Sequence, residues 1–237
     1  MTGRGTVAID CLHAELSPQV DRCAVVGVDV IRATTTALTA VDAGRRCFPV
    51  ASLQAAFELA ERLDDPLVAG ELGGSKPYGF DIQNSPTEVL AQGEVHRPMI
   101  LLSTSGTGLL CAAAARTPTY VACLRNWRAQ ARHLTASHEH VLLMGADSRG
   151  EFREEDQLCC ARIAAHLVRE GFVPTDEFTR RVLDRWASAK DDAFLPSRSV
   201  TYLRATGQEH DLQFVLDHVD DLPAVFTMRE GEVVRTS

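Results

Sequence analysis

Short apolar runs alternate with longer amphipathic stretches along residues 7–171. Residues 24–31, AVVGVDVI, form a nearly continuous apolar run, which is typical of a strand covered on both faces. Residues 53–63 instead repeat apolar side chains at the spacing of a helix. The pattern predicts strands at 7–11, 24–31, 47–50, 67–70, 99–102, 120–123 and 141–145, and helices at 34–43, 53–63, 108–115, 127–134 and 154–170. This alternation indicates an α/β fold with three α/β/α layers and a largely parallel sheet.

Two parts of this alternation resemble each other. When Thr36 is aligned with Thr107, Leu38 meets Leu109 further along the chain. The match is consistent with an internal duplication of residues 24–97 and 98–171, which would make two similar βαβ halves; chance similarity between α/β units of equal period is the alternative. In a duplicated chain, we expect a binding site where the corresponding loops of the two halves face each other.

The alternation ends near Gly171. Beyond it, the pattern predicts helices at 176–186, 200–204 and 211–216, followed by two paired strands over 222–228 and 233–234. We interpret residues 172–237 as a C-terminal extension of a single domain that spans residues 1–237.

Composition and charge narrow the classes of function. The chain has 237 residues, of which 45% are hydrophobic and 24% charged, so it can bury a core and is neither disordered nor a coiled coil as a whole. Its net charge of -8 disfavours nucleic acid and anionic membranes as partners but leaves room for a local pocket that binds a small anion. The longest uncharged stretch, residues 98–115, carries six small or polar residues at its centre, unlike a membrane helix.

The cysteines indicate the compartment. There are seven, none in a CxxC pair, and the N-terminus lacks the pattern of a secretory signal. We therefore expect buried, reduced thiols and a cytoplasmic protein. The sequence leaves open whether the protein forms a homo-oligomer.

Polar residues of the types that take part in catalysis and ligand binding follow four of the predicted strands. The first group runs from Asp29 to Thr36, DVIRATTT. A carboxylate in an apolar strand must be paired or must bind a cation. An internal ion pair between Asp29 and Arg32 is one interpretation. The other is an anion site, because the hydroxyl and N–H groups of Thr35 and Thr36 lie at a predicted helix start.

The second group is a glycine-rich loop from Gly70 to Pro86. Asn84-Ser85-Pro86 is typical of a turn that starts a helix. That interpretation leaves Glu71 and Asp81 unexplained, and both can offer oxygen ligands to a hard cation.

The third group is Ser103–Thr107, STSGT, between a strand and a helix. Such a turn can either cap the helix through Ser105 or cradle a phosphate, although it lacks the lysine of a nucleotide-binding P-loop. The fourth group holds Glu155 and Asp156 in the first turn of a helix, where acids favour the helix dipole or can complete a magnesium site.

These groups, in this order, resemble motifs of the 2-phosphosulfolactate phosphatase (ComB-type) family. The resemblance covers the stretches Asp29–Thr36, Gly70–Gly74, Gly79–Pro86, Ser103–Thr107, Glu155–Asp156 and Gly207–Leu212. Leu72 stands where the family usually has Arg, and Ser105 where it usually has Asn. The two departures bear on the exact substrate more than on the hydrolytic class.

The resemblance implies a magnesium-dependent phosphatase that converts 2-phospho-3-sulfolactate and water to 3-sulfolactate and phosphate. The catalytic residues would be Asp29, Arg32, Glu71 and Asp81. The substrate would be bound by Arg32, Thr35, Thr36, Gly73, Asn84, Thr104, Ser105, Gly106 and Thr107. The Mg²⁺ ligands would be drawn from Asp29, Glu71, Asp81, Glu155 and Asp156.

Three points stay open at this stage. One of the acids can serve as general base or as a covalent nucleophile, so both direct water attack and a phosphoenzyme are compatible with the sequence. A different small anionic phosphate ester is an alternative substrate, favoured by Leu72. A non-catalytic protein that binds anions or a partner on the same scaffold is the alternative outside enzymes.

Overall fold

A single mixed sheet organises the computed structural model, which describes residues 4–11, 18–147 and 150–236. The sheet has ten strands in the order β4-β5-β3-β10-β9-β6-β2-β7-β1-β8. The strands are β1 (Gly5–Cys11), β2 (Ala24–Val28), β3 (Cys47–Val50), β4 (Leu67–Gly70), β5 (Met99–Leu102), β6 (Thr119–Ala122), β7 (His140–Gly145), β8 (Phe172–Pro174), β9 (Val225–Arg229) and β10 (Glu232–Thr236).

Helices fill most of the connections between these strands. They are α1 (Ala33–Asp42), α2 (Leu53–Ala60), α3 (Pro86–Ala91), α4 (Gly106–Ala114), α5 (Trp127–Ser137), α6 (Glu154–Arg169), α7 (Glu177–Trp186), α8 (Arg198–Ala205) and α9 (Glu209–Asp217), with a 3-10 helix at Pro18–Arg22. Across the described residues, no helix is both long enough and apolar enough to cross a membrane.

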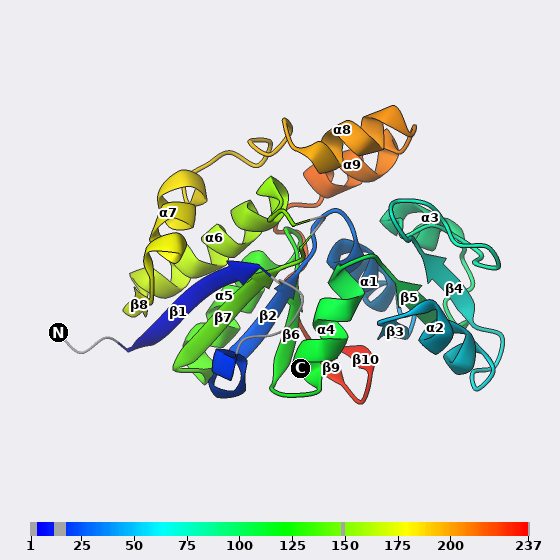
Figure 1. Cartoon of the computed structure of the whole chain (residues 1–237), viewed down its shortest axis with the longest axis horizontal. Coiled ribbons are helices and arrows are strands. Elements are labelled where there is room, and N and C mark those ends of the chain that lie inside the picture. The colour runs from blue at the N-terminus through cyan, green and yellow to red at the C-terminus, as the bar shows by residue number, and fades with distance from the viewer. Residues whose placement is uncertain (1–3, 12–17, 148–149, 237) are drawn as a thin grey trace.

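The sheet consists of two parallel groups of strands joined by an antiparallel hairpin. One group is β4-β5-β3 and the other is β6-β2-β7-β1-β8. The hairpin β9-β10 lies between them, with β10 antiparallel to β3 and β9 antiparallel to β6 (Figure 1). Few residues pair at these junctions. Val233 pairs with Cys47 on one side, and Tyr120 and Val121 pair with β9 on the other.

The two predicted halves of the chain interlace in the sheet. Strand β2, the first of one half, lies between β6 and β7 of the other half. Strand β5, the first of the second half, lies between β3 and β4 of the first. The two loops that follow β2 and β5 therefore each start from the middle of a parallel trio.

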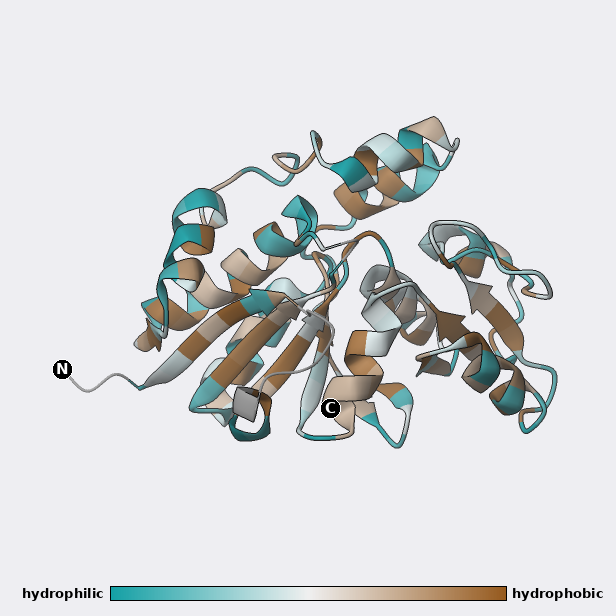
Figure 2. Cartoon of the chain, in the orientation of Figure 1, coloured by the Kyte–Doolittle hydropathy of each residue, from teal (hydrophilic) through white to brown (hydrophobic). Residues whose placement is uncertain are grey.

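Helices cover both faces of the sheet, as the apolar strands require. Val25 of β2 packs with Leu109 and Ala113 of α4 on one face. Its neighbour Val26 faces the main core, which includes Leu158 of α6. Figure 2 shows hydrophobic residues concentrated along the strands and on the inner sides of the helices. The predicted three-layer α/β architecture is confirmed.

The elements differ from the sequence-based prediction in three places. Strand β2 ends at Val28, before Asp29, so the carboxylate stands in the following turn and not inside the strand. Strand β8 was not predicted. The C-terminal segment supplies β8, β9 and β10, and the last two lie at the middle of the sheet, so this segment is part of the central architecture.

Candidate active site

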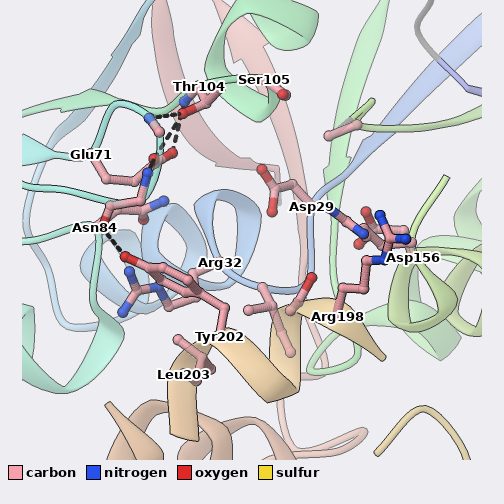
Figure 3. A pocket seen from close by; sticks show the side chains of 16 residues that line it. Asp29, Arg32, Glu71, Asn84, Thr104, Ser105, Asp156, Arg198, Tyr202 and Leu203 are labelled. Atoms are coloured by element: carbon pink, nitrogen blue, oxygen red, sulfur yellow. Dashed lines mark hydrogen bonds between the residues drawn. The ribbon is translucent and has the colours of Figure 1, made fainter. Parts of the chain in front are cut away.

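A cavity of about 210 Å³ lies where the turns after β2, β4 and β5 meet helix α8 of the C-terminal segment. Figure 3 shows Asp29 near its centre, with Glu71 and Thr104 on one side and Asp156 and Arg198 on the other. The lining consists of Asp29, Ile31, Arg32, Glu71, Gly73, Gly74, Asn84, Thr104, Ser105, Ala146, Arg153, Asp156, Arg198, Ser199, Tyr202 and Leu203.

The turn after β2 fixes Asp29. The Thr34 hydroxyl accepts from the Asp29 backbone N–H at 3.0 Å and donates to the Asp29 carbonyl at 2.8 Å. The carboxylate then packs against the first residue of α4: a Cβ added to Gly106 would lie 2.2 Å from Asp29 Oδ2. Only a glycine at this position lets the carboxylate approach so closely, and the positive end of the α4 dipole favours its charge.

The environment of Asp29 makes its ionisation costly. Burial, assisted by the negative charge of Glu71, raises the pKa of Asp29 to about 7. Burial and the charge of Asp29 also raise the pKa of Asp156, and both carboxyls line the same cavity. Two buried acids that line one cavity and whose pKa values are both raised form a site at which a cation is strongly favoured.

Arg32 is held by the C-terminal segment and not by Asp29. Its Nη1 donates to Asp211 Oδ2 at 2.6 Å and also to Gln208 Oε1, both from the region of α9. The predicted ion pair between Asp29 and Arg32 is therefore replaced by a buried pair between Arg32 and Asp211. The peptide bond between Ile31 and Arg32 is cis.

Glu71 ties the glycine-rich loop to the turn after β5. Its Oε1 accepts from the Thr104 N–H at 2.7 Å, and its Oε2 accepts from the Thr104 hydroxyl at 2.8 Å and from the Gly74 N–H at 2.7 Å. The Gly73 N–H donates to the Thr104 hydroxyl at 2.8 Å. Both carboxylate oxygens of Glu71 are thus already engaged in organising the loop.

Two polar side chains remain available to a ligand. Ser105 occupies the N-cap position of α4 but makes no side-chain capping bond, and it lines the cavity. Asn84 is 2% exposed, and within the described part of the chain its Oδ1 has no hydrogen-bond partner. The interpretation of Ser105 as a plain cap does not hold, because its hydroxyl caps nothing.

Asp156 and two arginines line the opposite side of the cavity. Asp156 Oδ1 accepts from the Val30 N–H at 2.7 Å, which links the start of α6 to the turn after β2. Arg153 and Arg198 both form ion pairs with Glu151, so one exposed carboxylate orients two guanidinium groups at the rim. This side of the cavity therefore carries both an acidic group and two cationic groups.

Two of the predicted acids are not brought into the cavity. Asp81 turns toward the body of β4, where its Oδ2 accepts from the Val68 N–H at 2.8 Å, and its side chain is 46% exposed. Glu155 is 1% exposed and faces Ser197 and Ser199 at the start of α8, while burial raises its pKa. Neither side chain lines the cavity, so the predicted five-acid set reduces there to Asp29, Glu71 and Asp156.

Most of the threonines predicted to bind substrate instead form hydrogen bonds within the turns. Thr35 donates to the Val30 carbonyl at 2.7 Å, and Thr107 accepts from the Ser103 N–H at 2.8 Å. Thr36 is fully buried, and its hydroxyl has no partner in the described ranges. Thr35, Thr36 and Thr107 lie outside the cavity lining, as does Gly106, whose part is to make room for Asp29.

Sequence reasoning missed Arg153, just before α6, and several residues of the C-terminal segment. Arg198, Tyr202 and Leu203 of α8 form one wall, and the Tyr202 hydroxyl donates to the Gly74 carbonyl at 2.6 Å. No local motif marks α8. Asp211 did carry a signal, because residues 207–212 resemble a family motif, but the sequence assigned it no role.

Comparisons with known proteins find relatives that share one family description. A family model described as 2-phosphosulpholactate phosphatase matches residues 11–231. The chain is 33% identical over 189 residues to "2-phosphosulfolactate phosphatase" of Methanothermobacter thermautotrophicus, with 80% of each chain covered.

Two further relatives carry the name "Probable 2-phosphosulfolactate phosphatase". The protein of Caldanaerobacter subterraneus is 28% identical over 219 residues, covering 90% of each chain. That of Carboxydothermus hydrogenoformans is 40% identical over 134 residues, covering 56% of each chain.

The raised pKa of Asp29 predicts that Asp29→Asn stabilises the protein, and more so at high pH. Between about pH 4 and pH 7, the folded protein keeps a proton that the unfolded chain has released, so the free energy of unfolding falls as the pH rises through this window. An amide cannot ionise and escapes this loss. With a chelator present, we expect the Tm to rise by roughly 5 °C at about pH 8, from a gain on the order of 2 kcal/mol, and by less at about pH 4.5.

The control for this measurement is Glu61→Gln, which makes the same acid-to-amide change at an exposed position at the end of α2. Its Tm should match that of the unmodified protein at both pH values. A Tm difference for Asp29→Asn that does not grow with pH would contradict the proposed cost of ionising Asp29.

Proposed function

The chain belongs to the 2-phosphosulfolactate phosphatase family, and we propose that it hydrolyses 2-phospho-3-sulfolactate to 3-sulfolactate and phosphate with Mg²⁺ as cofactor. The observation that carries this proposal is one cavity that is lined by Asp29 and Asp156 together with three arginines. The seven cysteines are all free thiols, which supports the cytoplasm as the compartment.

Charge complementarity supports the substrate. 2-Phospho-3-sulfolactate carries a phosphate, a carboxylate and a sulfonate on a three-carbon skeleton. Arg32, Arg153 and Arg198 give the cavity three guanidinium groups, which suit planar recognition of such oxyanions. Attraction of this substrate therefore needs no positive net charge on the protein, whose total is -8.

Leu72 makes no contact with the cavity. It is 38% exposed and lies outside the cavity lining, and its backbone N–H donates to the Ser75 carbonyl at 2.9 Å within the loop. The charge that an arginine would bring to this position is absent, so another small phosphate ester stays the alternative substrate. Ser105, the other departure from the family pattern, does line the cavity.

The donor set fits Mg²⁺ held jointly by protein and substrate. Within the described residues, no three His, Cys, Asp or Glu side chains gather closely enough to hold a metal by themselves. Mg²⁺ is usually bound through one or two carboxylates, with waters and substrate phosphate as the other ligands. Asp29 and Asp156 are the two that would hold it, because both oxygens of Glu71 are engaged by Thr104 and Gly74. When bound, such an ion polarises a phosphoryl oxygen and offsets its charge.

Side chains of the cavity and the start of α4 would supply the other groups that the reaction needs. Arg32 is a fixed, buried donor that can stabilise the equatorial oxygens of the phosphoryl group as charge develops on them. The Ser105 hydroxyl and the start of α4 add further donors. Asp29 would hold the ion through one carboxylate oxygen, and its other oxygen can accept a proton or attack phosphorus directly.

Gly106→Ala tests the placement of Asp29. The new Cβ would meet Asp29 Oδ2 at 2.2 Å and must displace it, so we expect kcat to fall by about 100-fold. Gly108→Ala is the matched control on the same helix, because a Cβ there meets nothing within 4 Å. It should retain kcat within about twofold and gain up to roughly 1 kcal/mol of stability. Equal kcat for the two variants would show that the position of Asp29 is unimportant.

Release of phosphate from a panel of esters tests the function itself. We expect hydrolysis of 2-phospho-3-sulfolactate to stop with EDTA and return with Mg²⁺, and the ester without the sulfonate, 2-phospholactate, to be a poorer substrate.

Asp156→Asn should raise the Mg²⁺ concentration for half-maximal activity by about 10-fold, because changes to a metal ligand or to the groups around it lower metal affinity by about this factor. Glu154→Gln, in the same turn of α6, should not change it.

Each failure in that experiment has a distinct meaning. Preference for an ester without a sulfonate would replace the substrate and keep the reaction. Absence of metal-dependent release from every ester would instead support an anion-binding or interaction protein on this scaffold.

Arg198 is the group that we assign to the sulfonate, because it lies on the side of the cavity away from Glu71 and its side chain is 75% exposed. Arg198→Met should lower kcat/KM for 2-phospho-3-sulfolactate by roughly 10- to 100-fold, as expected for one charge-assisted hydrogen bond. The value for 2-phospholactate should change far less. Arg204→Met, in the last turn of the same helix, is the control. An equal loss with both substrates would show that Arg198 does not read the sulfonate.

A further inference from the structure

Asp211 is a fully buried carboxylate that joins three segments distant in sequence. It lies in α9 and is 0% exposed. Its Oδ2 accepts from Arg32 Nη1 at 2.6 Å, while its Oδ1 accepts from the Ser85 and Thr87 hydroxyls at 2.7 Å each. One carboxylate thus ties the turn after β2 to the start of α3 and to the C-terminal segment.

The pair with Arg32 is poorly explained by stability alone. Arg32 is 5% exposed, so both charges are removed from water. The attraction within a buried pair is largely offset by the loss of hydration, and such a pair often adds little net stability. What it does supply is a fixed geometry, because neither charge can leave the other without a large cost.

The contacts of Arg32 leave part of its guanidinium group available to a ligand in the cavity. Among the described residues, the hydrogen bonds of its guanidinium all leave from Nη1, to Asp211 and Gln208. Arg32 also lines the cavity, so the donors on Nη2 and Nε are the ones that a ligand can use. A planar group held at one corner by two acceptors presents these donors in one orientation.

We propose that Asp211 is a positioning residue for the hydrolysis: it holds Nη1 of Arg32 so that the remaining guanidinium donors face the phosphoryl group. Through Ser85, the same carboxylate also anchors the residue that follows Asn84, another cavity side chain. This inference rests on the proposed function, because it assumes that Arg32 binds the transferred phosphoryl group.

The direct test is Asp211→Asn, which keeps the shape of the side chain and removes its charge. Arg32 keeps its positive charge but loses its orientation, so we expect kcat to fall by about 10- to 100-fold while KM changes less than about threefold. Glu209→Gln, an acid-to-amide change in the first turn of the same helix, should alter neither value. A merely structural role for Asp211 would lower the Tm and leave kcat per folded molecule unchanged.

A double-mutant cycle with Arg32→Lys separates positioning from general damage. If Asp211 acts through Arg32, adding Asp211→Asn to Arg32→Lys should cost less than about threefold in kcat, although each change alone costs at least about 10-fold. If the two losses multiply, the proposal is overturned.

Two further measurements keep the test decisive. Should Asp211→Asn not fold, Gln208→Met is the substitute. It removes the second acceptor of the Arg32 Nη1 hydrogen bonds at a partly exposed site, and it should lower kcat by about 3- to 10-fold with little change in Tm.

Should the unmodified protein not hydrolyse 2-phospho-3-sulfolactate, the proposed function fails, and calorimetric binding of inorganic phosphate replaces kcat as the readout. The variants should then bind phosphate about 10-fold more weakly, because inorganic phosphate has no carboxylate or sulfonate for the other arginines to hold and so depends on Arg32 more than the ester does. Unchanged affinity or unchanged kcat would overturn the positioning role.

Discussion

The contact between the Asp29 carboxylate and Gly106 is the constraint on which the site depends. It joins the turn after β2, in one parallel group of strands, to the start of α4, which follows β5 in the other group. Any side chain at position 106 would collide with this carboxylate, so the close approach exists only because the first residue of α4 has no Cβ. Asp29 is thereby buried where its ionisation is costly, and that cost is what makes it ready to bind a cation or a proton.

The interlaced sheet explains how two distant turns come to share one ligand. Each turn follows the middle strand of a parallel trio, and the antiparallel hairpin β9-β10 holds the two trios together. The last strands of the chain therefore determine how the first functional turn, after β2, sits relative to the second, after β5. Internal duplication of residues 24–97 and 98–171 stays a prediction, and the interlacing is the arrangement that two such halves would share.

Much of the fold was predictable because its signals are local. Apolar runs such as Ala24–Val28 need burial on both faces whatever surrounds them, and Asn84-Ser85-Pro86 starts α3 as predicted, with the Ser85 hydroxyl accepting from the Glu88 N–H at 3.1 Å. The site was predictable only in part, because a motif gives residue types and not side-chain directions. Asp81 turns back to Val68, and Thr35 bonds to the Val30 carbonyl; in both cases a nearby backbone group competes for the polar side chain. The partner of Arg32 was out of reach, since Asp211 lies 179 positions further along the chain.

The C-terminal segment completes the site, and its helix α8 does so without any sequence motif that marks it. Tyr202 donates to the Gly74 carbonyl, and a Cβ on Gly74 would collide with the same hydroxyl, so α8 rests directly on the glycine-rich loop. Arg198 lines the cavity, whereas the buried Asp211 lies behind it and holds the guanidinium of Arg32. Under the proposed function, the turns after β2 and β5 would supply the groups for phosphoryl chemistry, and α8 and α9 would supply recognition and orientation. Because the two sets lie on different parts of the chain, substitutions in α8 can alter which anion is accepted without moving Asp29.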